Sequence, residues 1–251
     1  MHALLAAIII LLWAGIAQAQ GPIPALRLYT EEYPPITFAR DGRADGLGTA
    51  IVREIMRRTG TDAPIEVVPW ARGYLYATRD ANTGLFVTTR TPAREALFKW
   101  VGPVTATRAA LYKRRGDPLV LSALDQARIA GGIVVPRNWY LHQQLQARAF
   151  ENLVEVATPG EAIRLLAGGR AQLMALDDVT LATSRAAVKV EAEALVEALP
   201  LDDAVQYIAF SQGTDEDLVT HWQAALDAMK ADGSYLTLYH RWLPGARPPG
   251  S

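Results

Sequence analysis

Residues Leu85–Val104 read LFVTTRTPAREALFKWVGPV and combine a strand pattern, a helix start and an unusually placed cation. Leu85–Val87 is a short apolar run of the kind found in buried strands. Thr91 and Pro92 then form a helix start, with threonine as the N-cap and proline at the first helical position, where its missing N–H has no cost. The sequence therefore predicts a strand followed by a helix of about two turns over Ala93–Phe98.

Arg94 lies three residues past the predicted N-cap, where a capping box has Glu or Gln. A cation at this position opposes the positive end of the helix dipole. A bound anion would explain the arginine, because free backbone N–H groups and a guanidinium can converge on one carboxylate there. The alternative, from these residues alone, is a solvated arginine on a surface turn.

The composition excludes several partners and chemistries. The 251 residues include 25 Lys and Arg against 26 Asp and Glu, and half of the residues are apolar. This balance, without basic clusters, argues against nucleic acid or an anionic membrane surface as a partner. The chain contains no cysteine, which excludes disulfides, thiolate metal sites, a cysteine nucleophile and a lipidated cysteine anchor. The internal histidines lack carboxylate neighbours at motif spacing, so we expect neither a metal nor a cofactor.

The N-terminus resembles a secretory signal peptide. Ala3–Ala17 is apolar but shorter than the roughly 20 residues that span a bilayer. It ends in Ala17-Gln18-Ala19, a small-x-small cleavage pattern, so residues 1–19 are predicted to be removed and the mature chain to begin at Gln20. The n-region lacks Lys and Arg, and a buried N-terminal helix is the alternative. With no further apolar segment, we expect a free periplasmic protein without a membrane anchor.

Strand-like and helix-like segments alternate after Gln20. The predicted strands are Leu26–Tyr29, Ile65–Val68, Leu85–Val87, Ile133–Val135, Leu153–Val156, Leu173–Leu176 and Val205–Ser211. The predicted helices are Thr49–Arg58, Ala71–Thr78, Tyr140–Ala149, Pro159–Ala167, Val179–Ala186 and Leu218–Met229. A polar stretch around Leu111–Pro118 separates two such series. Periodicity alone therefore predicts an α/β fold with two clusters of elements.

Several segments resemble the family 3 extracellular solute-binding proteins, the periplasmic receptors of amino-acid ABC transporters. Thr89–Arg94 followed by Phe98–Pro103 resembles the carboxylate-binding signature of that family. Thr30–Pro35 resembles its first ligand loop and Pro69–Arg72 its second. Lys230–Trp242 resembles its C-terminal helix pair. The resemblance covers nearly all of the mature chain, and the segments occur in the right order.

The resemblance implies a type II periplasmic-binding-protein-like fold, in which two lobes each contain a mostly parallel sheet flanked by helices. It divides the chain into a signal peptide at 1–19, a first lobe of 20–110 and 207–251, and a second lobe of 111–206. Two strands would cross between the lobes, near Ala109–Lys113 and Val205–Ala209. We expect the ligand in the interlobe cleft, at the carboxyl ends of the strands.

The resemblance also implies roles for individual residues. The family arginine that matches Arg94 grips the substrate α-carboxylate, helped by hydroxyls at the position of Thr89. An acid that follows the strand Leu173–Leu176 pairs with the substrate ammonium. Asp177 matches this acid better than Asp178 does, and one of the two is also expected to be the N-cap of the next helix.

Aromatic and acidic residues in the two ligand loops are further candidates. Tyr33 matches an aromatic that stacks on the ligand, and Trp70 matches a position that lines the pocket. Packing in the core is the alternative for both. Glu32 either holds its loop or contacts a ligand cation.

The segment Val135-Pro136-Arg137-Asn138 departs from the family pattern. At this point the family commonly has a Gly-Thr or Gly-Ser turn that completes the carboxylate site. Pro136 removes a backbone donor, and Arg137 adds a second cation. Either Arg137 replaces the hydroxyl and favours a ligand with an extra carboxylate, or the loop faces water. Asn138 is the other candidate for the place of the hydroxyl.

Residues and resemblance together predict a periplasmic solute receptor, not an enzyme. It would bind a small amino acid or related carboxylate, close its lobes around the ligand as a monomer, and deliver it to a membrane ABC permease. One alternative is a dehydratase-like enzyme on the same fold, with Glu32, Asp177 and Asp178 as its available acids. The other is a stand-alone receptor that feeds a separate sensor.

Overall fold

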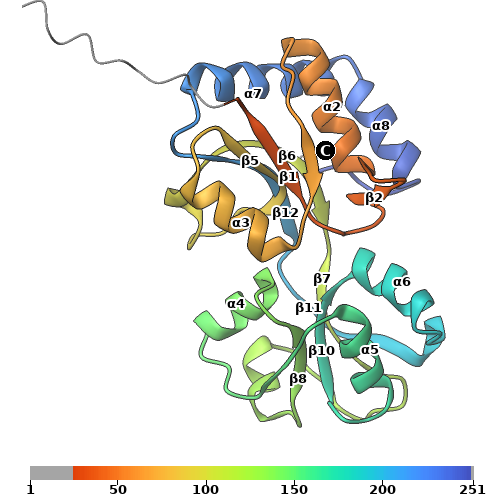
Figure 1. Cartoon of the computed structure of the whole chain (residues 1–251). Helices are drawn as coiled ribbons and strands as arrows, with labels where there is room; N and C mark the ends of the chain where they lie inside the picture. The colour runs from red at the N-terminus through yellow and green to blue at the C-terminus, as the bar shows by residue number, and fades with distance from the viewer. Residues whose placement is uncertain (1–24, 250–251) are drawn as a thin grey trace, which may run out of the picture.

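Two five-stranded sheets form the centres of two lobes in the computed structural model, which describes residues 25–249 (Figure 1). The predicted signal peptide lies outside these residues. Lobe 1 contains β1 (Arg27–Thr30), β2 (Phe38–Arg40), β3 (Arg43–Asp45), α2 (Leu47–Thr59), β4 (Ile65–Val67), α3 (Trp70–Arg79), β5 (Thr83–Thr89), β6 (Phe98–Thr107), β12 (Ala204–Ser211), α7 (Glu216–Ala231) and α8 (Ser234–Trp242). Lobe 2 contains β7 (Ala109–Arg114), β8 (Ile133–Pro136), α4 (Tyr140–Ala147), β9 (Leu153–Val156), α5 (Pro159–Ala167), β10 (Leu173–Asp177), α6 (Asp178–Ala187) and β11 (Leu195–Pro200).

Both sheets mix parallel and antiparallel strands. The order is β4-β1-β5-β12-β6 in lobe 1 and β11-β7-β10-β8-β9 in lobe 2. β1, β4 and β5 are parallel, as are β8, β9 and β10. The strands next to the crossings, β6 and β12 in one lobe and β7 and β11 in the other, pair antiparallel. In each sheet one strand, β12 in lobe 1 and β7 in lobe 2, runs opposite to the other four, so each sheet is mostly parallel, as predicted.

The chain changes sheets at Arg108, between β6 and β7, and returns over residues 201–203, between β11 and β12. The sequence predicts the crossings near Ala109–Lys113 and Val205–Ala209, and the observed connections lie just before these two segments, each of which is inside one sheet. Their ladder hydrogen bonds to neighbouring strands hold them there, so the crossing is confined to the short connections before them.

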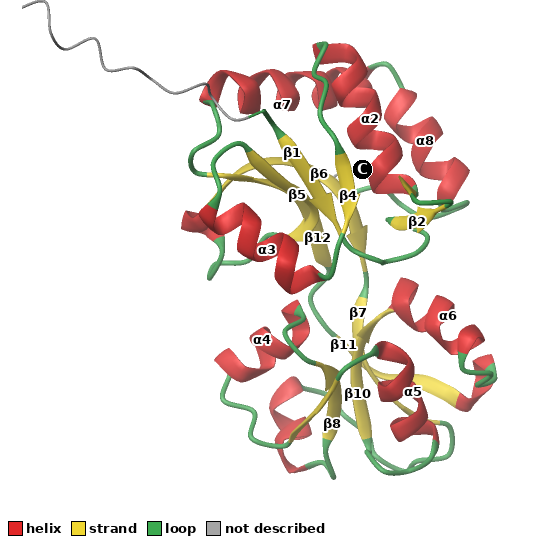
Figure 2. Ribbon diagram, viewed as in Figure 1, coloured by secondary structure: helices red, strands yellow, loops and turns green. Residues whose placement is uncertain are grey.

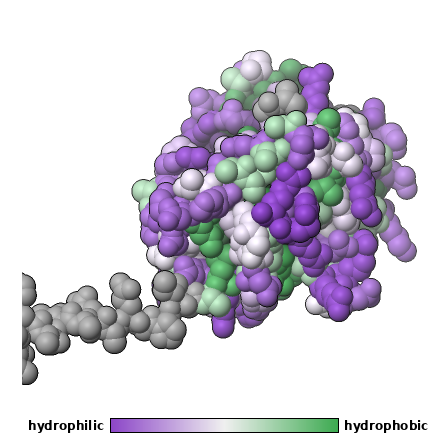
Figure 3. Space-filling model, turned by 90° about the horizontal axis from the view of Figure 1, so that it is seen from above, coloured by the Kyte–Doolittle hydropathy of each residue, from purple (hydrophilic) through white to green (hydrophobic). Residues whose placement is uncertain are grey.

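Helices cover both faces of each sheet, as Figure 2 shows. In lobe 1 the side chains of α2, α7 and α8 form the larger core, with Trp222, Leu226 and Ile51 fully buried. A smaller cluster under α3 includes Leu85 and Phe98. Seen from the end of lobe 1, the outer surface is largely hydrophilic (Figure 3), as expected for helices with one apolar face. Within residues 25–249, no helix has both the length and the apolar character needed to cross a bilayer.

The turn into α2 holds the loop that follows β1. Gly46 has φ 106°, and a Cβ on it would lie 2.5 Å from the carbonyl oxygen of Ile36, so only glycine fits. The first N–H groups of α2 then donate to the preceding loop, Leu47 to Pro35 at 3.2 Å and Gly48 to Ile36 at 2.8 Å. These bonds replace a side-chain cap and fix the loop that carries the first cavity residues.

The predicted helix over Ala93–Phe98 is wrong. The segment is a turn followed by one 3₁₀ turn at Glu95–Leu97, and Phe98 already begins β6. Phe98 pairs with Ser211 of β12, so pairing between distant strands overrides the local Thr-Pro helix start.

Candidate functional site

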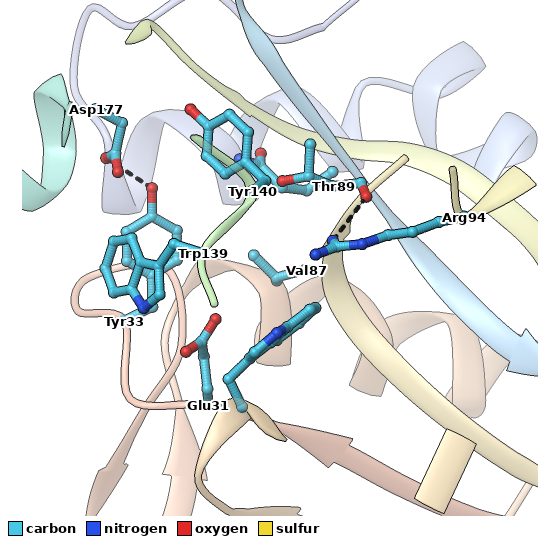
Figure 4. Close-up of a pocket in the computed structure, with 10 residues that line it drawn as sticks. Glu31, Tyr33, Val87, Thr89, Arg94, Trp139, Tyr140 and Asp177 are labelled. Atoms are coloured by element: carbon cyan, nitrogen blue, oxygen red, sulfur yellow. Dashed lines mark hydrogen bonds between the residues drawn. The ribbon is translucent and has the colours of Figure 1, made fainter. Parts of the chain in front are cut away.

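A cavity between the lobes gathers side chains from the carboxyl ends of strands in both sheets (Figure 4). Its lining residues are Glu31, Tyr33, Trp70, Val87, Thr89, Arg94, Trp139, Tyr140, Asp177 and Gln206. The cavity volume is about 40 Å³, which is room for a few water molecules. A larger ligand can therefore enter only when the lobes move apart.

Arg94 is buried to 2% exposure at the lobe 1 side of this cavity. Its Nη1 donates to the carbonyl oxygen of Thr89 at 3.1 Å, and its Nη2 donates to Oε1 of Gln143, on α4 of lobe 2, at 2.9 Å. Its Nε is buried and has no hydrogen-bond partner among the described residues. A guanidinium has five N–H donors, so Arg94 retains donors for a bound anion.

Two aromatic rings also pack against the guanidinium of Arg94. Its Cζ lies 5.0 Å from the ring centroid of Trp70 and 5.5 Å from that of Tyr74. Burial lowers the pKa of Arg94, against the raising influence of Tyr74 and Glu31. The stacked rings hold the guanidinium plane in place while contributing cation–π attraction.

Asp177 presents the opposite charge from lobe 2, at 1% exposure. Its Oδ1 accepts hydrogen bonds from the backbone N–H of Thr180 and from the hydroxyl of Tyr33, both at 2.8 Å. Its Oδ2 accepts from the Thr180 hydroxyl at 2.7 Å. Burial raises the pKa of Asp177, and the hydrogen bonds from Thr180 and Tyr33 oppose this rise.

Glu31 is a second carboxyl group at the cavity and follows directly after β1. Burial raises its pKa to about 7; the charge of Arg94 lowers it, and that of Asp177 raises it. Thr37 donates to its backbone oxygen, but no described residue donates a hydrogen bond to its side chain. The side chain therefore faces the cavity with its acceptors free.

Four aromatic residues frame the space between these charges. Tyr33 and Trp70 come from lobe 1, and Trp139 and Tyr140 come from the start of α4 in lobe 2. Tyr33 and Trp139 meet edge to face across the lobes, with ring centroids 6.5 Å apart. The Tyr140 hydroxyl is buried and lacks a partner in the described structure, so it is one more group available to a ligand.

Val87 lines the cavity from a strained position in β5. Its φ is 61°, which is an outlier for a β-branched residue. Thr88 and Phe86 pair with successive residues of β12, so Val87 forms a bulge without a partner. Strain of this kind persists where the surrounding structure imposes it, often at binding sites.

The family model of bacterial extracellular solute-binding proteins, family 3, matches residues 26–245. The chain belongs to this family. No protein of curated function matches the sequence.

Solved structures of the same fold agree with the family assignment. A histidine kinase sensor domain with similarity to periplasmic binding proteins is 21% identical and covers 90% of this chain and 98% of its own, with a TM-score of 0.79. A mutant arginine-binding protein from T. maritima is 19% identical over 87% and 95% of the two chains, with a TM-score of 0.72. A His/Glu/Gln/Arg/opine family-binding protein from Silicibacter pomeroyi, in complex with lysine, is 22% identical over 89% and 99%, with a TM-score of 0.70.

The structure divides the residues predicted for the site into two groups. Tyr33, Trp70, Thr89, Arg94 and Asp177 line one cavity. Their ligand contacts remain proposals, but the structure brings their side chains together from both lobes.

The sequence proposes Arg137 and Asn138 as ligand contacts, but they do not line the cavity, which agrees with the alternative in which their loop faces water. The Arg137 side chain is 60% exposed and pairs with Glu155 at 2.9 Å. Asn138 is exposed and adopts φ 65°. This left-handed turn, which asparagine tolerates, directs Arg137 outward and places Trp139 at the cavity instead.

The structure also shows where the acids with alternative assignments lie. Asp178 is exposed and accepts from the backbone N–H of Arg108 at 3.2 Å, whereas Asp177 lies at the cavity and is itself the N-cap of α6. Glu32 holds its loop, since its Oε1 accepts from the N–H of Ala39 at 2.8 Å.

Sequence reasoning missed five lining residues: Glu31, Val87, Trp139, Tyr140 and Gln206. Glu31 adjoins the predicted Glu32, and the Glu-Glu pair before Tyr33 could have indicated it. Trp139 and Tyr140 directly follow the predicted Asn138. Nothing local marks Gln206, because it reaches the cavity through the pairing of β12 with β6.

Proposed function

We propose that this family 3 solute-binding protein is a receptor that binds a small amino acid or related carboxylate between its lobes. One observation carries the proposal: Arg94 and Asp177, oppositely charged and almost fully buried, reach the same cavity from different lobes. Buried charges are costly unless paired, and an α-amino acid would bring a carboxylate to one and an ammonium to the other. Buried groups without a partner, Arg94 Nε and the Tyr140 hydroxyl, support the same reading.

The proposed mechanism is closure of the lobes about the two short crossings. A ligand that contacts groups on both lobes binds the closed form more tightly than the open form, so it shifts the population toward closure. Arg94 and Thr89 would hold the carboxylate, Asp177 the ammonium, and Tyr33 and Trp70 the remainder. The closed form would then dock as a monomer on a membrane ABC permease.

The proposed location is the periplasm, after cleavage before Gln20. It rests on the signal-peptide pattern in the sequence and on the family, whose members are extracellular solute-binding proteins. N-terminal sequencing of protein from the periplasmic fraction tests it, and recovery of Met1 would reject it.

A thermal-shift screen followed by calorimetry of the mature protein tests the receptor function. The panel contains the standard L-amino acids, small mono- and dicarboxylates, and polyamines. We expect binding of at least one amino acid or carboxylate, and loss of that binding in Arg94→Ala by roughly 2–5 kcal/mol.

A matched control is Arg90→Ala, because the side chain of Arg90 is 38% exposed and ion-pairs with Glu95. It should bind like the wild type. Native circular dichroism with unchanged affinity in Arg94→Ala would reject the assigned site. Recovery of the ligand unchanged after long incubation would separate a receptor from a dehydratase-like enzyme.

A further inference from the structure

The charges that face the cavity do not balance for a neutral zwitterion. Three lining side chains can carry a full charge: the carboxylates of Glu31 and Asp177 and the guanidinium of Arg94. With all three ionised, the lining carries a net charge of −1. A zwitterionic ligand adds no net charge, so one carboxylate would remain without a cation in a closed cavity, which is unfavourable.

The hydrogen bonds indicate that Glu31 is the carboxylate left over. Asp177 already accepts three hydrogen bonds, from Thr180 twice and from Tyr33, of the roughly four that a carboxylate can accept. The Glu31 side chain accepts none from the described residues. It also forms no ion pair with Arg94 within 4.0 Å, and Arg94 instead donates to Thr89 and Gln143.

The surroundings of Glu31 suit a cation. In Figure 4 its carboxylate points toward Trp139, in the space framed by the aromatic side chains. Aromatic faces attract ammonium and guanidinium groups, most strongly where water is excluded. The Glu31 carboxylate and the aromatic rings would therefore both attract a cationic group of a ligand.

We propose that Glu31 binds a second cationic group, so that the receptor selects ligands with one carboxylate and two cationic groups, as in cationic amino acids. This inference rests on the proposed function, because it takes the carboxylate of the ligand to lie on Arg94 and its ammonium near Asp177. It assigns the net charge of the ligand, which the receptor function alone leaves open.

The proton on Glu31 offers a readout of this contact. The pKa of Glu31 is about 7 in the ligand-free cavity because of burial, so near neutral pH a fraction of the molecules carries a carboxylic acid there. A cation favours the ionised form, so binding should release part of a proton to the buffer. The other titratable groups at the cavity are Arg94, Asp177, Tyr33 and Tyr140. Both tyrosines have pKa values raised well above their usual value by burial, so they stay protonated in this range.

Pairs of ligands with nearly equal shape but different charge test this proposal. L-Arginine and L-citrulline differ in a guanidinium against a neutral ureido group, and L-lysine, L-ornithine, L-glutamine and L-glutamate complete the set. Isothermal titration calorimetry of the wild type should give arginine, lysine or ornithine an affinity at least about 30-fold above the neutral and acidic members, since removing one partner of a buried charge pair costs that much or more.

Glu31→Gln should remove this preference while keeping the size of the side chain. The affinity for the preferred cationic ligand should fall by about 30-fold or more, and the affinity for citrulline and glutamine should change little. Titrations at pH 6 in buffers of different ionisation enthalpy should show clearly more proton release in the wild type than in the variant, in which Asp177 remains the acid that can release a proton.

Glu32→Gln is the matched control. It makes the same change of charge one residue away, and its amide oxygen can still accept from Ala39. A general electrostatic effect would appear in both variants, whereas a direct contact would appear only in Glu31→Gln. Equal losses in the two variants would overturn the proposal.

The failure of this inference can be told apart from the failure of the receptor function. If the wild type binds glutamine, citrulline or glutamate as tightly as the cationic set, Glu31 does not select a cation, although the receptor function stands. If no amino acid or carboxylate binds, the receptor function itself fails.

Discussion

The phenolic hydroxyl of Tyr33 donates a 2.8 Å hydrogen bond to Oδ1 of Asp177, and this bond joins the two lobes across the cavity. Tyr33 follows β1 of lobe 1, whereas Asp177 ends β10 of lobe 2. The bond can exist only when the lobes are close together. Together with the Arg94–Gln143 contact, it makes closure depend on the same side chains that line the cavity.

Tyr33→Phe should therefore shift the ligand-free protein toward an open form. A hydrogen bond to a charged acceptor contributes about 1.5–3 kcal/mol, which is roughly a factor of ten to a hundred in the closed population. Small-angle scattering should show a larger radius of gyration for the variant, and ligand affinity should fall by up to the same factor. Tyr140→Phe is the control for the radius of gyration of the ligand-free protein, because the Tyr140 hydroxyl has no partner among the described residues. Equal radii for Tyr33→Phe and the wild type would refute the role of this bond in closure.

Asp177→Asn should weaken ligands that carry an ammonium by about 2–5 kcal/mol, and simple carboxylates much less. The fold should persist, because asparagine is an equally good N-cap for α6. Calorimetry with an amino acid and its deaminated analogue measures the difference. Asp178→Asn, exposed and outside the cavity, should leave both affinities unchanged. If Asp178→Asn shows the selective loss instead, the assignment of the ammonium site is wrong.

Arg137→Ala should leave ligand affinity within about 0.5 kcal/mol of the wild type, as for a substitution on the surface. The side chain is 60% exposed and pairs with Glu155, away from the cavity. The same titrations used for the other variants check this result. A large loss of affinity for dicarboxylates would restore the hypothesis that Arg137 binds an extra carboxylate.

The position of Arg94 could be predicted because its signals are local. The strand β5, the turn after it and the arginine lie within a few residues, and the carboxyl end of a parallel strand is where α/β proteins bind ligands. The predicted helix over Ala93–Phe98 failed for a non-local reason, since Phe98 is drawn into β6 by its pairing with β12.

Contacts between the lobes could not be read from the sequence. The partner of Arg94 is Gln143, 49 residues away on α4, and its position depends on how the two lobes meet. Arg137 shows the same limit, because one left-handed residue, Asn138, decides which of the neighbouring side chains faces the cavity. Trp139 rather than Arg137 reaches it.

The stability of the ligand-free protein should fall as the pH rises from about 4.5 to about 7. Burial raises the pKa of Glu31 from 4.5 to about 7, so between these values the folded protein holds a proton that the unfolded chain has lost. The unfolding free energy decreases with pH wherever the folded state binds more protons. Asp177, whose pKa is also raised by burial, contributes in the same direction.

Other acids do not obscure this trend. The hydrogen bonds from Arg57 and Arg58 lower the pKa of Glu54 to about 2, so the stability contributed by Glu54 is complete above pH 4.5 and is lost only at lower pH. Differential scanning calorimetry between pH 4.5 and 8 should give a melting temperature that declines and then levels off above pH 7. Glu31→Gln should flatten the decline, whereas Glu32→Gln should keep it. A wild-type slope in Glu31→Gln would show that the buried carboxyl of Glu31 is not the group that titrates.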